Sequence, residues 1–432
     1  MTPAVIRRQV VLEEHALSPD GRFAIVVRRF VQANRYRSHL WVVPLVAGLG
    51  RTRRLTEGAV RDSFPRVSPD GRLVAFRRVR HADADSTNRL MIVAVAGGEP
   101  WTPLPDGATA PSVSELAWSP DGEGIAYTSP AGPPRFIVGP EPRRTADPSR
   151  SDAQIDTSPV ARRITRIDWR WDEEGHRDRW DHLFVISSAR GRRRKPRLLT
   201  RGDFGVSGLA WHPDGGRIAF AADRGAEADL RPRPTIWDVT AAPRSASDAE
   251  PREILASGGP VGSPAFSPDG RWLAVIGWTD PEPFDDVSPG VLVGPADGSA
   301  PPLPLAPTLD RPAGVWLDTD LGGWMNSSRP GPAWADGRTV IALVTDRGRS
   351  VPWRFPLDPT TGRPAGEPTP IVRADAACRD LDVAAASEHR PATVGVVGTF
   401  DGRAMELMTV EHDERGRRPR LVRRTTMGAA WQ

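Results

Sequence analysis

Short apolar segments alternate with polar turns along almost the whole chain. Stretches such as Phe23–Val27, Leu73–Phe76 and Leu273–Ile276 are rich in β-branched and aromatic side chains. Glycine, proline, serine and aspartate bound these stretches, as is typical of strands in an antiparallel sheet. No part of the chain alternates strands with helices in a regular pattern. The sequence therefore predicts a nearly all-β protein built from many short strands.

The turns between these strands repeat one motif, a tetrapeptide close to Ser-Pro-Asp-Gly that is shortened in its last copy. Its serine bonds back to the backbone, its proline presets φ, and its glycine accepts a positive φ, so the motif predicts a type I turn with a glycine exit. We assign its aspartates to turn formation rather than to catalysis or metal binding. The turn residues are Asp20, Gly21, Asp70, Gly71, Asp121, Gly122, Asp214, Gly215, Asp269, Gly270, Asp336 and Gly337.

The repeat of this turn predicts the architecture. A period of roughly 40–50 residues, with one such turn and several short strands in each unit, is typical of a β-propeller. We expect one domain over residues 1–432 with seven blades. Eight blades is the alternative, because the long gap between Asp121 and Asp214 could hide another unit. The expected blades span approximately 10–56, 60–104, 113–200 (with an insertion at 130–179), 206–256, 261–306, 330–373 and 381–425.

Charge and cysteine content narrow the function classes. The net charge is only +4, from 58 basic and 54 acidic residues that are interspersed along the chain, so we expect no nucleic-acid partner. The basic run at 190–195 is interpreted as a solvated hairpin tip. A single cysteine, Cys378, excludes an internal disulfide framework. With no apolar leader and no long apolar run, we expect a cytoplasmic protein without membrane contact.

Three stretches carry a resemblance to a known family. They are residues 34–43 leading to Arg54–Thr56, residues 163–170 leading to the strand at 181–185, and Thr345–Gly348. Together with the turn motif they resemble the β-propeller of the prolyl-oligopeptidase family of serine peptidases, in its acylaminoacyl-peptidase and dipeptidyl-aminopeptidase branch. The repeats alone are also similar to those of TolB-like propellers. In the peptidases the propeller caps the active site of an α/β-hydrolase domain and limits access to short peptides.

The chain departs from that family in its catalytic motif. The family's nucleophile lies in Gly-x-Ser-x-Gly, and this chain offers only Gly205–Leu209, which lacks the second glycine and precedes a strand. We therefore expect no catalytic residue, and the sequence leaves open whether the protein takes part in an enzyme. The leading hypothesis is a non-catalytic propeller, truncated or split, that acts with a separate hydrolase. The alternative is a self-standing TolB-like interaction scaffold without a role in proteolysis.

Partners follow from these two hypotheses. An α/β-hydrolase bound in trans and peptides are the expected partners. Self-association is also expected, because a propeller without its hydrolase domain would expose an apolar face.

Few residues outside the repeat suggest chemistry. The eight histidines are scattered and no glycine-rich phosphate loop opens a helix, so we expect neither metal nor cofactor. Glu173 and Glu174 follow two tryptophans and could bind a substrate ammonium group, as a similar segment does in the dipeptidyl-peptidase branch; the alternative is a solvated turn. Trp316 and Trp324 lie outside the repeat and are candidates for a partner surface; the alternative is a loop that covers the propeller face.

Overall fold

A computed structural model describes most of the chain. The described residues are 8–80, 87–104, 112–139, 161–171, 175–191, 195–242, 250–281, 287–317, 330–400, 402–411 and 419–426.

Strands make up nearly all of the regular structure in this part of the chain, which confirms the all-β class. The first strands are β1 (Val10–Leu17), β2 (Phe23–Gln32), β3 (Arg35–Pro44), β4 (Arg53–Arg54), β5 (Val60–Val67), β6 (Leu73–Arg80), β7 (Arg89–Ala94), β8 (Leu116–Trp118), β9 (Gly124–Ala131), β10 (Arg170–Trp171), β11 (Gly175–His176), β12 (Trp180–Ser187) and β13 (Arg197–Leu198). The later strands are β14 (Ser207–Trp211), β15 (Arg217–Ala222), β16 (Thr235–Thr240), β17 (Arg252–Leu255), β18 (Val261–Phe266), β19 (Trp272–Gly277), β20 (Gly290–Pro295), β21 (Leu303–Pro304), β22 (Ala333–Asp336), β23 (Thr339–Asp346), β24 (Arg349–Pro356), β25 (Thr369–Pro370), β26 (Ala376–Ala384), β27 (Thr393–Phe400), β28 (Glu406–Glu411) and β29 (Arg420–Arg423). A short 3₁₀ turn, η1 (Ile167–Trp169), precedes β10.

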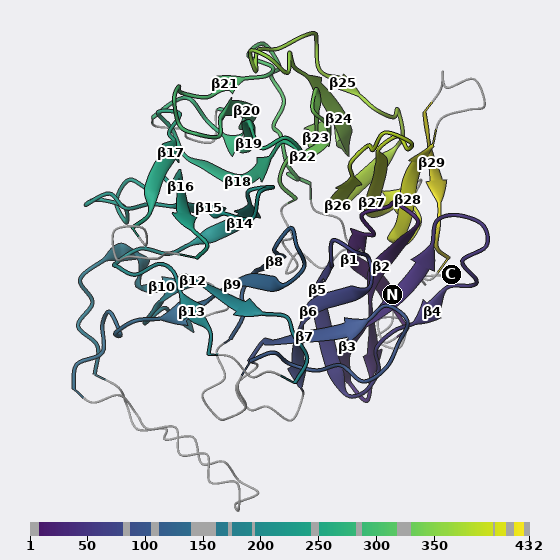
Figure 1. Cartoon of the computed structure of the whole chain (residues 1–432), viewed down its shortest axis with the longest axis horizontal. Helices are drawn as coiled ribbons and strands as arrows, with labels where there is room; N and C mark the ends of the chain where they lie inside the picture. Colours follow the sequence, from purple (N-terminus) through teal and green to yellow (C-terminus); the bar gives the residue numbers. More distant parts are fainter. Residues whose placement is uncertain are drawn as a thin grey trace, which may run out of the picture.

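Strands that follow one another along the chain pair antiparallel, so each sheet forms from local sequence. For example, β14 to β17 pair in the order β14-β15-β16-β17, and β18 to β21 do the same. Two sheet boundaries are bridged by a single parallel pair, Ser38 with Arg61 and Ser350 with Ala377. The sheets stand around a common centre with the first strand of each innermost (Figure 1). This arrangement is the predicted β-propeller.

The Ser-Pro-Asp-Gly turns have the expected hydrogen bonds. In the first, the Gly21 amide donates to the Ser18 carbonyl at 2.8 Å, and the Ser18 hydroxyl donates to the Asp20 carboxylate at 2.6 Å. Gly21 has φ of 64°, and Gly71, Gly122, Gly215 and Gly270 have similar values. The shortened copy differs, because Gly337 has no positive φ and the Arg338 amide donates to Asp336 at 2.7 Å.

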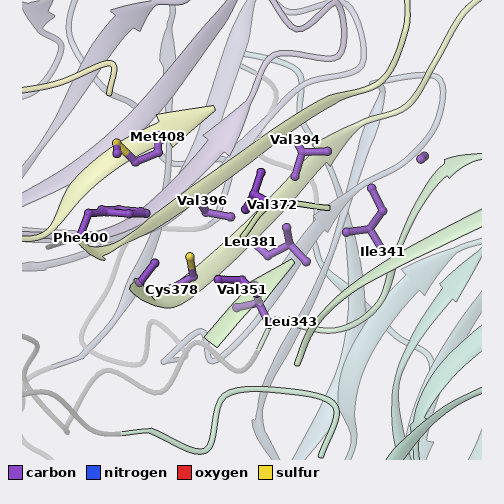
Figure 2. Packing of buried hydrophobic residues seen from close by; sticks show 12 residues of the cluster. Ile341, Leu343, Val351, Val372, Cys378, Leu381, Val394, Val396, Phe400 and Met408 are labelled. Carbon is purple, nitrogen blue, oxygen red and sulfur yellow. The ribbon is translucent and has the colours of Figure 1, made fainter. Parts of the chain in front are cut away.

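Apolar clusters lie between neighbouring sheets rather than in one central core. Figure 2 shows the cluster between the sheet of β22 to β25 and the sheet of β26 to β29. It includes Leu343, Val351, Cys378, Leu381 and Val396, all buried. Full burial of such a side chain contributes about 1.5–3 kcal/mol. Contact between sheets is therefore the main apolar contribution to the stability of the ring.

The blade-three insertion is anchored to the propeller by arginine–aspartate pairs. Arg166 contacts Asp203 at 2.5 Å and Asp229 at 3.5 Å, both outside the insertion, whereas Arg162 contacts Asp178 at 2.6 Å within it. The insertion carries the hairpin β10–β11, in which Arg170 pairs with His176. These ion pairs hold the described part of the insertion beside β12.

The predicted blade limits can be compared with the strands only in part. The strand β26 begins at Ala376, five residues before the expected limit of 381. Because several connecting ranges lie outside the described residues, the count of seven blades, with eight as the alternative, and the limits stay predictions. Across the ranges that the structure describes, no helix has the length and apolarity to span a bilayer.

Candidate functional site: a cavity at the centre of the ring

A cavity of about 540 Å³ lies where the first strands of the sheets converge. Its lining comes from β1, β5, β8, β14, β18, β22 and β26, which surround the centre in Figure 1. The cavity is the place where residues far apart in the sequence meet, and it is the candidate site.

The innermost strands bend at this cavity because most of them contain a β-bulge. The pairing register shifts between Ser63 and Arg66 in β5, and at similar places in β1, β14, β18 and β26. Three bulge residues have a positive φ: Phe64 at 55°, Gly208 at 65° and Ser263 at 54°. A bulge re-aims the side chains and amide groups of a strand. Here it turns polar groups toward the centre of the ring.

Two glutamates, the buried Glu14 and the partly buried Glu115, bond the bulge amides of the next sheet. Phe64 donates its amide hydrogen to Glu14 at 2.7 Å, and Gly208 donates to Glu115 at 2.8 Å. Burial raises the pKa of both glutamates, although these hydrogen bonds and nearby arginines act in the opposite direction. Each glutamate therefore links its own sheet to the next one at the cavity.

The first and last sheets are joined at the cavity by a buried ion pair, and we call this contact the seam. The Asp380 carboxylate accepts hydrogen bonds from the His15 amide at 2.7 Å and from His15 Nδ1 at 2.6 Å. Asp382 accepts from the Leu17 amide at 2.7 Å. Burial alone would lower the pKa of His15, but the Asp380 charge raises it; burial alone would raise the pKa of Asp380, but His15 lowers it.

Arg66 is the guanidinium that lines the cavity without an ion pair. Its Nη1 donates to the Pro65 carbonyl at 2.8 Å, and its charge lies 3.8 Å from the centre of the Phe64 ring. Arg77 lies over the same ring at 4.7 Å. Among the described residues, no carboxylate lies within ion-pair distance of Arg66. Arg66 therefore keeps donors for a ligand.

An apolar pocket of about 250 Å³ adjoins the cavity. The two share Gly262, Ser263 and Pro330, and the pocket is otherwise lined mostly by prolines, small apolar residues, Trp278 and Trp316. The indole N–H of Trp316 donates to the Ala313 carbonyl at 3.1 Å, which fixes the ring although the residue is 53% exposed. Trp278, which also lines this pocket, is half-buried.

The predicted site residues are placed only in part. Trp316 lines the apolar pocket, whereas Trp324, Glu173 and Glu174 lie outside the described residues. The substrate-amine role of the two glutamates and the partner role of the tryptophans stay predictions. Within the described ranges, no three His, Cys, Asp or Glu side chains are grouped so as to hold a metal ion.

Sequence reasoning missed the residues of the cavity, although a signal for some of them was present. Glu14, Phe64, Glu115, Gly208 and Ser263 each precede the first residue of their turn motif by four positions. Residues at one repeat position of a propeller lie at the same radius from its centre. Aligning the repeats would therefore have placed these five together. Asp380 and Asp382 belong to the degenerate last unit and carry no such signal.

Comparison with solved structures identifies the fold. An acylaminoacyl peptidase in complex with Z-Gly-Gly-Phe-chloromethyl ketone matches 97% of this chain, with a TM-score of 0.61 and 13% sequence identity. The match spans 53% of that peptidase. The β-propeller domain of the trilobed protease from Pyrococcus furiosus, described as having an open velcro topology, matches 98% of this chain and 97% of its own, with a TM-score of 0.59 and 12% identity.

One curated sequence relative is similar over part of the chain. The uncharacterized peptidase YuxL of Bacillus subtilis (strain 168) is 30% identical over 211 residues, which are 48% of this chain and 28% of that peptidase. No family model matches the chain. The chain thus spans about half the length of the acylaminoacyl peptidase above and a smaller share of YuxL. The resemblance to the propellers of this peptidase family, predicted from the sequence, is confirmed at the level of the fold.

Proposed function

We propose that this chain is a non-catalytic propeller that controls the access of peptides to a serine hydrolase carried by a separate polypeptide. The observation that supports the proposal most is the full-length likeness to the propeller part of an acylaminoacyl peptidase. The central cavity adds to it, because a cavity lined by the first strand of each sheet offers a place for an extended peptide. The absence of a Gly-x-Ser-x-Gly motif from the sequence is consistent with a role that requires a partner.

Gating in this proposal is steric and polar. A cavity of about 540 Å³ has room for a few residues of an extended chain but not for a folded domain. The buried charges on its wall then distinguish peptides by their ends and side chains. The hydrolase would bind one face of the ring, so that peptides reach it past these groups.

The test is capture of a hydrolase by the tagged chain. The chain is incubated with lysate from its native source, and the eluate is treated with a fluorophosphonate probe that labels active serine hydrolases. The eluate is also assayed on acyl-amino-acid and aminoacyl chromogenic substrates. We expect a labelled band of another polypeptide and activity toward these substrates, while the purified chain alone is inactive.

A control bait and a comparison of two substrates make this experiment specific to the proposed function. An unrelated propeller with the same tag is the matched bait, and it should capture no labelled hydrolase. The captured activity should cleave a pentapeptide and spare the same sequence embedded in a folded protein. An eluate without a serine hydrolase would refute the proposal and favour a self-standing interaction scaffold.

A further inference from the structure

We propose that the cavity and the adjoining apolar pocket together bind the C-terminal end of a short peptide. Arg66 binds the terminal carboxylate, and an apolar side chain of the peptide enters the pocket between Trp278 and Trp316. The inference deepens the proposed function, on which it rests for peptides as the ligand class, and adds which end of the peptide is recognised.

The cavity wall contains both hydrogen-bond acceptors and donors, and the protein uses them to different extents. Three carboxylates line the cavity, those of Glu115, Asp380 and Asp382. Each already accepts at least one backbone N–H at 2.7–2.8 Å, and Asp380 also accepts from His15. Glu115 and Asp382 likewise accept a second backbone N–H, from Leu209 and Val383, so the protein itself fills about half of the acceptor sites of each carboxylate. The charged group on the wall with the most unused hydrogen-bonding capacity is a donor.

That donor is the Arg66 guanidinium. It carries five N–H groups, and the hydrogen bond to the Pro65 carbonyl uses only one of them. The Phe64 ring lies against it at 3.8 Å and fixes its orientation, and the hydrogen bond from the Phe64 amide to Glu14 holds that residue in its strained conformation. A planar guanidinium held in this way matches a carboxylate through two parallel hydrogen bonds.

The other charges of the cavity permit a carboxylate ligand. Asp380 is paired with His15, so its charge is largely neutralised at the wall. Burial favours the neutral form of Glu115, since it raises the pKa of that group. Arg77 lies over the same ring as Arg66 and adds a second positive charge nearby. Arg66 also interacts electrostatically with Glu14, Glu115 and Asp380, and burial raises the pKa of Glu14, so the positive charge beside Phe64 is carried by Arg66 and Arg77.

The apolar pocket supplies the second part of the proposed site. It opens beside the cavity, because Gly262, Ser263 and Pro330 line both. Trp278 and Trp316 offer flat apolar faces, and both indole N–H groups are bonded to backbone carbonyls, Trp278 to Val287 and Trp316 to Ala313. Because these rings are already held, a ligand loses little free energy in ordering them. An aromatic side chain suits this pocket best.

The experiment measures peptide binding to the full chain alone by isothermal titration calorimetry. The probe is Ala-Ala-Ala-Phe as the free acid, and its relatives are the C-terminal amide, the N-acetylated acid and Ala-Ala-Ala-Gly. We expect the amide to bind at least tenfold more weakly than the acid, since a charge-assisted pair is lost. Replacement of phenylalanine by glycine should weaken binding by about tenfold or more. N-acetylation should have no effect.

Variants assign these effects to the two parts of the site. Arg66→Gln should abolish the preference for the acid over the amide, and Arg66→Lys should retain part of it. Trp316→Ala should abolish the preference for phenylalanine and leave the preference for the acid. Matched controls are Arg72→Gln, at a side chain that is 85% exposed, and Leu230→Ala, at a residue that is 60% exposed. Neither control should change binding.

Several results would overturn the inference. They are equal binding of acid and amide, a loss of binding on N-acetylation, retention of the acid preference in Arg66→Gln, and no binding of any peptide at millimolar concentration. Peptide binding without a captured hydrolase would refute the proposed function and leave this site standing. A captured hydrolase without peptide binding would do the reverse.

Discussion

Replacing Asp380 by alanine should weaken the seam between the first and last sheets. Asp380 is buried and accepts two hydrogen bonds from His15, one from the backbone amide and one from Nδ1. The side chain of His15 is fully buried. The substitution leaves the buried imidazole of His15 and its buried backbone N–H without their acceptor. Removing one partner of a buried ion pair costs about 3–5 kcal/mol of the free energy of unfolding.

The loss of unfolding free energy in Asp380→Ala should depend on pH, and the direction of this dependence follows from the pKa shifts of His15 and Asp380. The pKa of His15 is raised above 6.5, so its contribution is fully present below pH 6.5 and disappears as the pH rises through the raised value. The pKa of Asp380 is lowered below 3.8, so its contribution is present above pH 3.8 and disappears as the pH falls through the lowered value. The pair therefore stabilises the ring most between these two limits. Once the pH exceeds the raised pKa of His15, only the cost of unmet hydrogen bonds remains, about 1–3 kcal/mol.

Urea unfolding at pH 5.5 and pH 9, followed by tryptophan fluorescence, measures this difference. Asp375→Ala is the matched control, because Asp375 lies one residue before β26 and its ion pair with Arg349 is exposed. The control should lose less than about 1 kcal/mol at either pH. If Asp380→Ala were destabilised equally at both values of pH, or by less than its control, the ion pair would not stabilise the seam.

Two further predictions concern buried groups elsewhere in the ring. Asp62→Ala should lower the free energy of unfolding by about 3–5 kcal/mol, because Arg78 donates two hydrogen bonds to Asp62, at 2.7 and 2.9 Å, and would be left buried without them. Urea unfolding measures this loss, and a loss below about 1 kcal/mol would contradict the reasoning. Cys378 should not react with a thiol reagent such as Ellman's reagent at pH 8 until the protein unfolds, because burial raises the pKa of its thiol to about 12. Rapid labelling of the native protein would contradict this prediction and show that the thiol is accessible.

Much of the fold could be predicted from the sequence because a propeller is built from local interactions. The Ser-Pro-Asp-Gly turns lie directly between paired strands, as Ser18 and Asp20 do between β1 and β2. The apolar stretches around them become buried strands. Local chemistry of this kind needs no knowledge of the rest of the chain.

The candidate site could not be predicted in the same way. His15 and Asp380 are separated by 365 residues, and only closure of the ring brings them into contact. The guanidinium of Arg66 could not be singled out among many arginines, since the sequence does not show which of them has no described carboxylate within ion-pair distance. The sequence suggested Glu173 and Glu174 of the insertion as site residues, whereas the polar groups of the described site lie on the strands before the turns.

The seam has a consequence for the way the protein folds. Each described sheet consists of strands that are neighbours along the chain, so its contacts are local and should form rapidly. The contacts of β1 with β26 and β27 are the exception, and they require closure of a loop of several hundred residues. Loop-closure entropy grows only with the logarithm of loop length, and preformed sheets shorten the effective loop further. Closure of the ring should therefore be a late and separate step in folding, and the pairing of His15 with Asp380 should report when it occurs.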